Sequence, residues 1–245
     1  MVRRKQKLVA KGFFAILFAA LFMVLTKVKL TPILGTQMKF SASVFFGPTI
    51  ASLIGITPGT LSIILAHAFG LIVGFYKIKN ITSYFTFLPI ILAGIYFAKM
   101  FKGDRKMIIP SAIAILLFLL HPIGREVWFY SLFWTIPIFI SLFKKKTDVL
   151  LRLKFFRVYA YALGSAYVDH AVGSIIYLYY LNIPAKFWVQ AIPLTLIERF
   201  IIAGGITFSY FAVKTAMKAL KEIAVSVAVI VEEKGKEVVV DGRSG

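Results

Sequence analysis

The sequence contains no cysteine and few acidic residues, and both scarcities limit the chemistry available to the protein. Without cysteine there is no disulfide, no thiolate metal ligand and no cysteine nucleophile. Aspartate and glutamate together number 10, and they form no carboxylate-rich cluster suited to Mg²⁺ and phosphate. The short motifs of zinc proteases, serine hydrolases and P-loop ATPases are also missing. We therefore expect no catalytic residues, no cofactor and no metal site.

Apolar residues, by contrast, are abundant. Of the 245 residues, 60% are hydrophobic and only 16% are charged, and the mean hydropathy is +0.86. This leaves too little polar surface to cover a water-soluble globule. The composition predicts an integral membrane protein with an all-α, polytopic helix bundle embedded in a lipid bilayer.

Lysine and arginine number 29, which gives a net charge of +19. Such a charge could indicate a nucleic-acid-binding surface, but the basic residues lie mainly between the apolar stretches. That placement is typical of membrane proteins, whose basic residues collect on the cytoplasmic side. We expect a cell-membrane protein that does not bind nucleic acid.

Glycine, proline and charged residues divide the hydrophobic sequence into eight segments. Several segments are shorter than the roughly 20 residues that a helix needs to cross the bilayer along its normal. We therefore expect six to eight crossings. An even number, with the amino and carboxyl termini both cytoplasmic, places most lysines and arginines inside. The segments are 12–27, 39–55, 60–76, 82–100, 107–122, 127–143, 156–181 and 187–212.

The pattern changes near the carboxyl end, which suggests a transmembrane domain at 1–217 and a cytoplasmic tail at 218–245. Two short stretches rich in β-branched residues, 225–231 and 237–240, flank a charged, glycine-containing segment. This arrangement predicts a small β-hairpin, with a disordered end as the alternative.

A stripe of small residues runs along the segment 60–76. Ser62, Ala66, Gly70 and Gly74 follow one another at intervals of four, which predicts close helix packing within the protein or, as the alternative, a dimer interface. His67 lies beside this stripe. It is a candidate substrate-binding residue or, alternatively, a side chain that hydrogen-bonds a neighbouring carbonyl.

Four ionisable residues lie deep in the last two segments. Asp169 and Arg199 are equally far from the turn at 182–184, about 22 Å along each helix, so they should meet at one depth. Because buried charges in a membrane are normally paired, we predict a structural Asp169–Arg199 ion pair. Adjacent helical residues point in different directions, which leaves His170 and Glu198 for another neighbour or for a substrate. A purely structural role for all four residues is an equally open interpretation.

The three tryptophans, Trp128, Trp134 and Trp188, lie near segment ends, where interfacial anchors are typical. A second interpretation places Trp188 and Phe187 in the wall of an external binding pocket.

With these residues identified, the chain resembles the substrate-binding S components of energy-coupling factor transporters. The resemblance rests on three stretches, which cover about a third of the chain. The first leads from 46–48 (FGP) through 57–59 (TPG) into the helix with the small residues, and the others are 167–174 (YVDHAVGS) and 192–200 (IPLTLIERF).

The resemblance implies a six-helix core, to which 107–122 and 127–143 would be additions. It also implies that Ala15 and Ala19 of the first helix contact a membrane-embedded coupling subunit. The protein would capture a small solute, such as a vitamin or its precursor, and reorient in the membrane. ATP hydrolysis would belong to separate subunits.

Two other hypotheses remain open at this point. A stand-alone secondary transporter or ion channel could use Asp169, His170 and Glu198 as a proton or cation relay. A membrane enzyme without a recognisable motif is the third.

Overall fold

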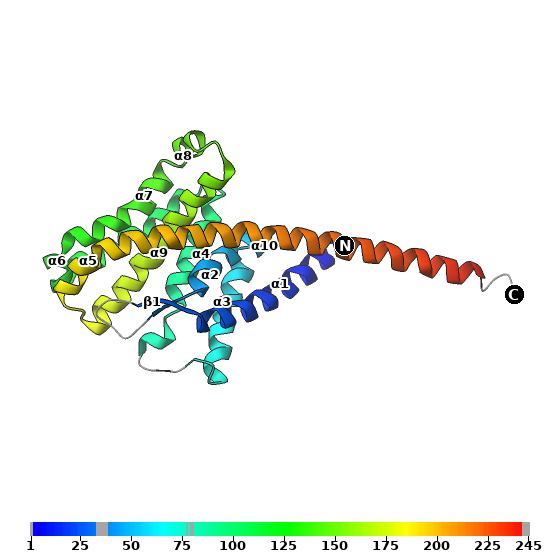
Figure 1. The fold of residues 1–245 in the computed structure, drawn as a ribbon, viewed down its shortest axis with the longest axis horizontal. Coiled ribbons are helices and arrows are strands. Elements are labelled where there is room, and N and C mark those ends of the chain that lie inside the picture. Colours follow the sequence, from blue (N-terminus) through cyan, green and yellow to red (C-terminus); the bar gives the residue numbers. More distant parts are fainter. Residues whose placement is uncertain (1, 33–38, 77, 79–80, 242–245) are drawn as a thin grey trace. The chain divides into compact units, whose positions relative to one another are not determined.

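The computed structural model describes residues 2–32, 39–76, 78 and 81–241. The described chain is almost entirely helical (Figure 1), as the composition predicted. Among the described residues, three helical stretches are long and apolar enough to cross a membrane: Val9–Lys27, Ile81–Met100 and Ala185–Ile223.

The amino-terminal half begins with a long helix and a short antiparallel ribbon, followed by three further helices. The elements are α1 (Val2–Lys27), β1 (Lys29–Pro32), β2 (Lys39–Ser41), α2 (Ser43–Ile54), α3 (Ile56–Ile72), the 3₁₀ helix η1 (Ile81–Tyr84) and α4 (Leu88–Met100). Helix α1 packs against α2 and α3, and α2 packs against α4.

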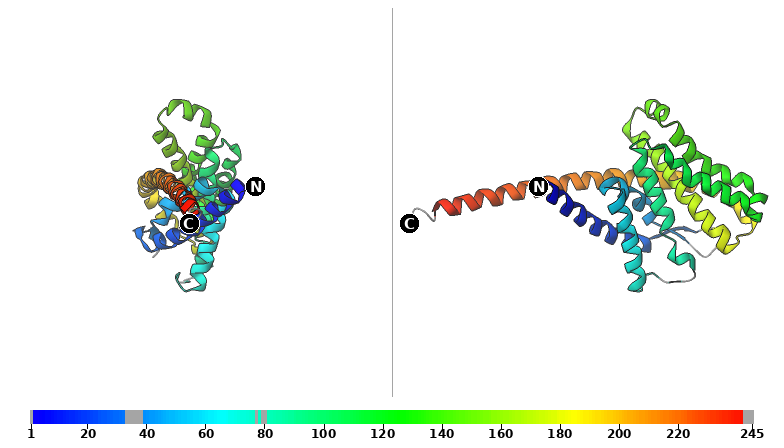
Figure 2. Two further views of the ribbon diagram at one scale, coloured as in Figure 1. Left: turned by 90° about the vertical axis from the view of Figure 1, so that its right-hand side faces the viewer. Right: turned by 180° about the vertical axis from the view of Figure 1, so that it is seen from behind.

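The second half contains short helices followed by two long ones. The elements are η2 (Arg105–Ile108), α5 (Ile109–Leu120), α6 (Pro122–Glu126), η3 (Trp128–Trp134), α7 (Thr135–Leu142), α8 (Lys144–Leu150), α9 (Lys154–Leu181) and α10 (Ala185–Asp241). Helix α9 packs against α4, α5 and α7, and Figure 2 gives two further views of the ribbon.

Large apolar side chains cover much of the outside of the helices. Ile16 on α1, Ile72 on α3 and Phe208 on α10 are each more than 70% exposed. Water would penalise so many exposed hydrophobic groups, whereas lipid would not. The surface is thus compatible with a membrane protein.

The segment 39–55 does not begin as a helix. Residues 39–41 form β2, which pairs with β1 in an antiparallel ribbon, and α2 starts only at Ser43. Helices α2 and α3 are then joined at Gly55, whose φ of +108° suits glycine. The cluster 57–59 therefore lies in the first turn of α3, where proline is well tolerated.

The predicted small-residue stripe is shorter than expected. Ser62, Ala66 and Gly70 are buried on α3, but the helix ends at Ile72 and Gly74 has a φ of +68°. A Cβ on Gly70 would lie 2.2 Å from the ring of Tyr76, so this glycine accommodates an aromatic side chain. Gly70 and Gly74 thus do not form a helix-packing motif, because Gly74 lies beyond the end of α3.

The predicted hairpin in the tail is wrong, because α10 continues as a helix to Asp241. Extending an existing helix adds a hydrogen bond per residue without a new nucleation cost. An isolated two-stranded hairpin is marginal in comparison. By its internal contacts the chain divides into two compact units, Met1–Ser209 and Tyr210–Gly245.

Candidate functional site

A cavity of about 560 Å³ lies within the first unit. Its volume falls in the range of small-molecule binding sites. Residues of α1, the β-ribbon, α2, α3, α4, η3, α9 and α10 line it. All five residues predicted to bind substrate are in its wall: His67, Asp169, His170, Trp188 and Glu198.

Charges are distributed unevenly around this cavity. The exposed side chains of Lys27, Lys29 and Lys39 lie at its rim, on α1 and the β-ribbon. The acidic groups Asp169 and Glu198 belong to its buried part, where their residues are 7% and 8% exposed. The cavity therefore has a basic mouth and an acidic interior.

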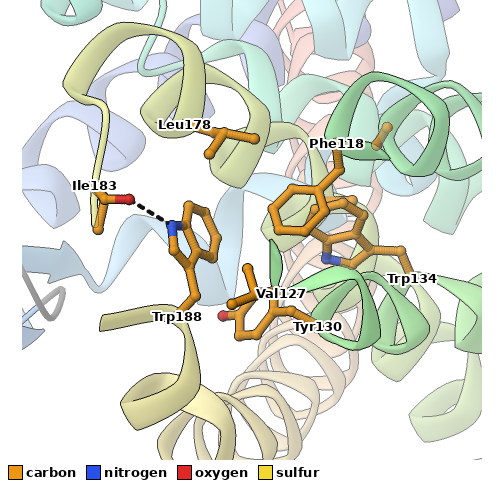
Figure 3. Packing of buried hydrophobic residues seen from close by; sticks show 9 residues of the cluster. Phe118, Val127, Tyr130, Trp134, Leu178, Ile183 and Trp188 are labelled. Carbon is orange, nitrogen blue, oxygen red and sulfur yellow. Dashed lines mark hydrogen bonds between the residues drawn. The ribbon is translucent and has the colours of Figure 1, made fainter. Parts of the chain in front are cut away.

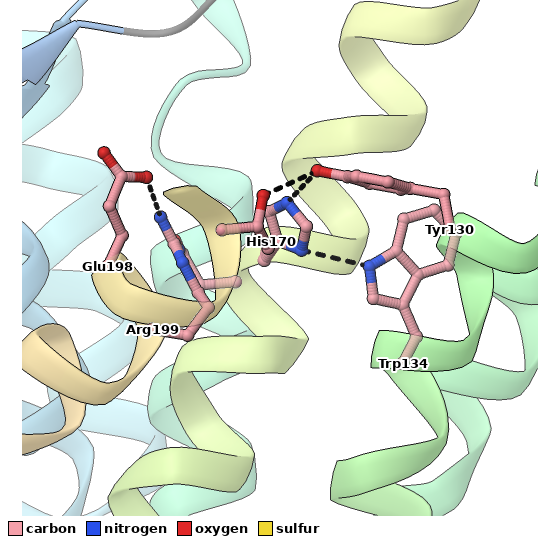
Figure 4. A network of polar contacts seen from close by, with 7 residues as sticks. Tyr130, Trp134, His170, Glu198 and Arg199 are labelled. Carbon is pink, nitrogen blue, oxygen red and sulfur yellow. Dashed lines mark hydrogen bonds and ion pairs between the residues drawn. The ribbon is translucent and has the colours of Figure 1, made fainter. Parts of the chain in front are cut away.

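Arg199 holds the two acidic groups together. Its side chain is completely buried, and its Nη1 lies 3.4 Å from Oδ2 of Asp169. Its Nη2 lies 3.6 Å from Oε2 of the adjacent Glu198, an additional ion pair that we did not predict (Figure 4). The structure thus brings Asp169 and Arg199 together across α9 and α10, and it adds Glu198 to the pair.

His170 belongs to a different polar network, on the side of α9 that faces η3. Trp134 Nε1 donates to His170 Nδ1 at 3.1 Å, and His170 Nε2 lies 3.0 Å from the Tyr130 hydroxyl (Figure 4). Because the indole nitrogen can only donate, Nδ1 must be the unprotonated nitrogen. The neutral ring then carries its proton on Nε2 and donates it to Tyr130. A second proton on His170 would break the bond from Trp134.

A buried aromatic cluster packs behind Tyr130 and Trp188, two of its members, which line the cavity (Figure 3). Phe118 packs edge-to-face against Trp134 and Trp188, with ring centroids 5.0 and 5.3 Å apart. Trp188 Nε1 donates to the carbonyl of Ile183 at 3.0 Å, which fixes the orientation of its indole. Such rigid, amphipathic rings are suited to contacting a planar ligand.

The three tryptophans differ in exposure and position, and they do not all fit the interpretation as interfacial anchors. Trp128 is 55% exposed, as an interfacial anchor would be. Trp134 is fully buried, so its assignment as an anchor is wrong, because its ring completes the aromatic core. Trp188 and Phe187 line the cavity.

His67 contacts a carbonyl and lines the cavity at the same time. Its Nε2 lies 3.1 Å from the Ser83 oxygen, and its ring stacks on Tyr76. Both interpretations of this histidine are compatible with its position.

Two other predicted positions lie away from the cavity. Ala15 and Ala19 are half-buried on α1, next to the buried Phe14 and Phe18. Among the described residues, no group of three His, Asp or Glu side chains is arranged to hold a metal ion.

Sequence reasoning missed Tyr130 and Thr195, whose hydroxyls are 2.8 Å apart in the cavity wall. Thr195 lies three residues before Glu198 and so shares its helix face, a spacing that could have revealed it. Tyr130 offered no such signal, because it comes from a 3₁₀ helix far away in the sequence.

The Tyr130 hydroxyl should make a measurable contribution to stability. Tyr130→Phe leaves the ring in place but removes the partner of both His170 Nε2 and Thr195 Oγ1. We expect a loss of about 1–3 kcal/mol in the free energy of unfolding, because buried polar groups are left unsatisfied. Denaturant titration of the purified protein in micelles measures this loss. Tyr179→Phe is the control, since its hydroxyl bond is exposed; equal losses would contradict the network.

The comparisons with known proteins show similarity to a distant relative. No protein-family model matches the chain, and no solved structure matches it. An uncharacterized protein of Methanocaldococcus jannaschii is 28% identical over 183 residues, which cover 66% of this chain and 62% of that protein. The chain is thus similar to a protein whose name states no function, and it spans less than two thirds of that protein's length.

Proposed function

We propose that the protein is the substrate-capture subunit of an ATP-driven uptake transporter of the energy-coupling factor type. The observation that carries the proposal is the position of the stretches behind the resemblance. Asp169, His170 and Gly173 of the stretch 167–174 line the cavity, as do Thr195 and Glu198 of the stretch 192–200. The stretches 167–174 and 192–200 thus supply residues that surround a ligand-sized space, whereas 46–48 and 57–59 do not line it.

The helices that supply the lining residues of the cavity support a six-helix core. Lining residues come from α1, α2, α3, α4, α9 and α10, together with the connections between them. The segments 107–122 and 127–143 contribute only Tyr130 to this cavity. In this proposal the two segments are additions to the six-helix core, and their helices α5 and α7 pack against α9.

The chemistry of the interior favours capture over a proton relay. A relay needs groups that gain and lose protons during turnover. His170 is held in one tautomer by Trp134 and Tyr130, and Asp169 is paired with a fully buried arginine. These contacts suit a rigid binding wall, because adding a proton to His170 or to Asp169 would break them.

In the proposed mechanism, solute enters the cavity from outside and the helix bundle reorients while it is docked on a coupling subunit. Ala15 and Ala19 of α1 would contact that subunit, since small side chains allow helices to approach closely. Both termini would be cytoplasmic in the cell membrane. Separate ATPase subunits would supply the energy, and the solute would be released unchanged.

The proposal predicts partners in the native membrane. We expect the tagged protein, purified gently from its own cells, to bring a membrane-embedded coupling subunit and ATPase subunits, identified by mass spectrometry. Ala19→Trp should abolish this recovery, because the larger side chain prevents close helix contact. Ala20→Trp, at an exposed position of the same helix, is the matched control.

Other outcomes would contradict the proposal. Proton-driven solute uptake by the isolated protein in liposomes would indicate the stand-alone transporter. Conversion of a lipid-soluble compound by the isolated protein would indicate an enzyme.

A further inference from the structure

The hydrogen bonds that begin at Trp134 have a defined direction. Trp134 donates to His170 Nδ1, and His170 Nε2 therefore donates to the Tyr130 oxygen. The phenol proton of Tyr130 then needs an acceptor, because an idle proton in a buried site is costly. Thr195 Oγ1, 2.8 Å away, is that acceptor.

The chain of donors ends at Thr195, which lines the cavity. Its hydroxyl oxygen accepts from Tyr130, so its own proton is available to donate. Among the described residues, Tyr130 is the hydrogen-bond partner assigned to Thr195, whereas Thr207 on the same helix donates to the carbonyl of Ala203. Bonds that point in one direction polarise one another, so the final donor is strengthened.

Glu198 presents the complementary group on the same helix face. Its Oε2 faces Arg199, but its buried Oε1 has no hydrogen-bond partner among the described residues. A carboxylate beside an arginine is an acceptor only. Leaving such an oxygen unpaired in a buried site is costly, so a cargo that donates to it gains affinity.

The charges around Glu198 also favour a cargo that donates a hydrogen bond. Asp169 and Glu198 supply two negative charges around the single positive charge of Arg199. The surplus negative charge favours an N–H group, neutral or cationic, and disfavours a carboxylate or phosphate at this position. The lysines that line the cavity belong to its exposed rim.

We propose that Thr195 and Glu198 form a donor–acceptor pair that recognises the amide or amidine edge of a planar nitrogen heterocycle. Such an edge carries an N–H donor for Glu198 next to an oxygen or ring-nitrogen acceptor for Thr195. Residues 195 and 198 are neighbours on one helix face, with Cβ atoms about 5–6 Å apart, which matches groups that are adjacent on one ring.

The rest of the wall fits a flat ring. Tyr130, Tyr177 and Trp188 line the cavity, and the indole of Trp188 is held in place by Ile183. Aromatic side chains favour stacked or edge-on contacts with planar ligands. The volume of about 560 Å³ accommodates one heterocycle with a substituent.

The test uses three matched pairs of compounds with the purified full-length protein. 9-Methyladenine, 1-methylcytosine and nicotinamide each carry an N–H donor beside an acceptor, and in each compound the exocyclic amino or amide group holds all of the N–H protons. Their N,N-dimethylated analogues keep the ring and the acceptor but lose the donor. Binding is measured by thermal shift and by quenching of tryptophan fluorescence.

We expect at least one parent compound to bind and its dimethylated analogue to bind about tenfold more weakly or worse, the loss typical of a hydrogen bond to a charged group. Thr195→Val and Glu198→Gln should each weaken binding of the parent by about tenfold. Thr207→Val removes another buried threonine hydroxyl on α10 and should leave binding unchanged.

Three results would overturn the inference: equal binding of parent and dimethylated analogue, unchanged binding by both Thr195→Val and Glu198→Gln, or no binding of any parent. The inference rests on the proposed capture function, but the two can fail separately. Recovery of coupling and ATPase subunits without heterocycle binding would refute the proposed heterocycle recognition but not the proposed transporter type. Heterocycle binding by a protein that has no such partners would refute only the transporter type.

Discussion

Replacing Arg199 with leucine is expected to lower the free energy of unfolding by about 3–5 kcal/mol. The substitution removes a fully buried cation and leaves Asp169 and Glu198 as neighbouring buried carboxylates without their counter-charge. Breaking a buried ion pair from one side costs far more than an exposed pair contributes. Denaturant titration in micelles measures the change.

A graded series of variants makes this prediction specific. Asp169→Asn should cost less than Arg199→Leu, because Arg199 keeps Glu198 as a partner and the amide still accepts a hydrogen bond. Arg125→Leu, at an exposed position on α6, should have little effect. If Arg199→Leu were as mild as Arg125→Leu, the charge cluster would have no structural role.

Gly173→Met is expected to abolish cargo capture without destabilising the protein. A Cβ at Gly173 meets no atom closer than Cγ of Pro89 at 3.8 Å, so the added side chain extends into the cavity. Replacing glycine within a helix also raises helix stability by roughly 0.5–1 kcal/mol. Mass spectrometry of compounds extracted from the gently purified protein should detect a small molecule in the wild type, and at least about tenfold less in the variant.

Gly12→Met provides the matched control, because Gly12 lies in α1 with open space around it and does not line the cavity. This variant should retain the extracted compound. Equal retention by Gly173→Met would show that the compound is bound elsewhere.

Helix positions were largely predictable from the sequence because apolar runs and breakers reflect burial and backbone chemistry directly. The meeting of Asp169 and Arg199 followed from the symmetry of the turn at 182–184 and from the cost of an unpaired buried charge. The position of His67 could not be predicted in this way. Only the folded structure shows that its ring both contacts the carbonyl of Ser83 and lines the cavity.

Other features depend on contacts that sequence periodicity does not report. The strand at 39–41 exists because it pairs with 29–32, a register that hydropathy does not contain. Tyr130 reaches His170 and Thr195 from a 3₁₀ helix inside an apolar run. The helix through 225–241 was missed because local β-propensity is a weaker guide than helix propagation.

Single-cysteine labelling tests the central claim most directly, namely that a cargo cavity lies within a membrane-embedded helix bundle. The chain has no native cysteine, so an introduced thiol reacts without background. In membrane vesicles, Gly173→Cys should react with a charged thiol reagent, because the cavity admits polar solutes through its lysine-lined mouth. Phe208→Cys, on the exposed apolar face of α10, should be protected by lipid. Equal labelling of both positions, or labelling of Phe208→Cys alone, would contradict the account.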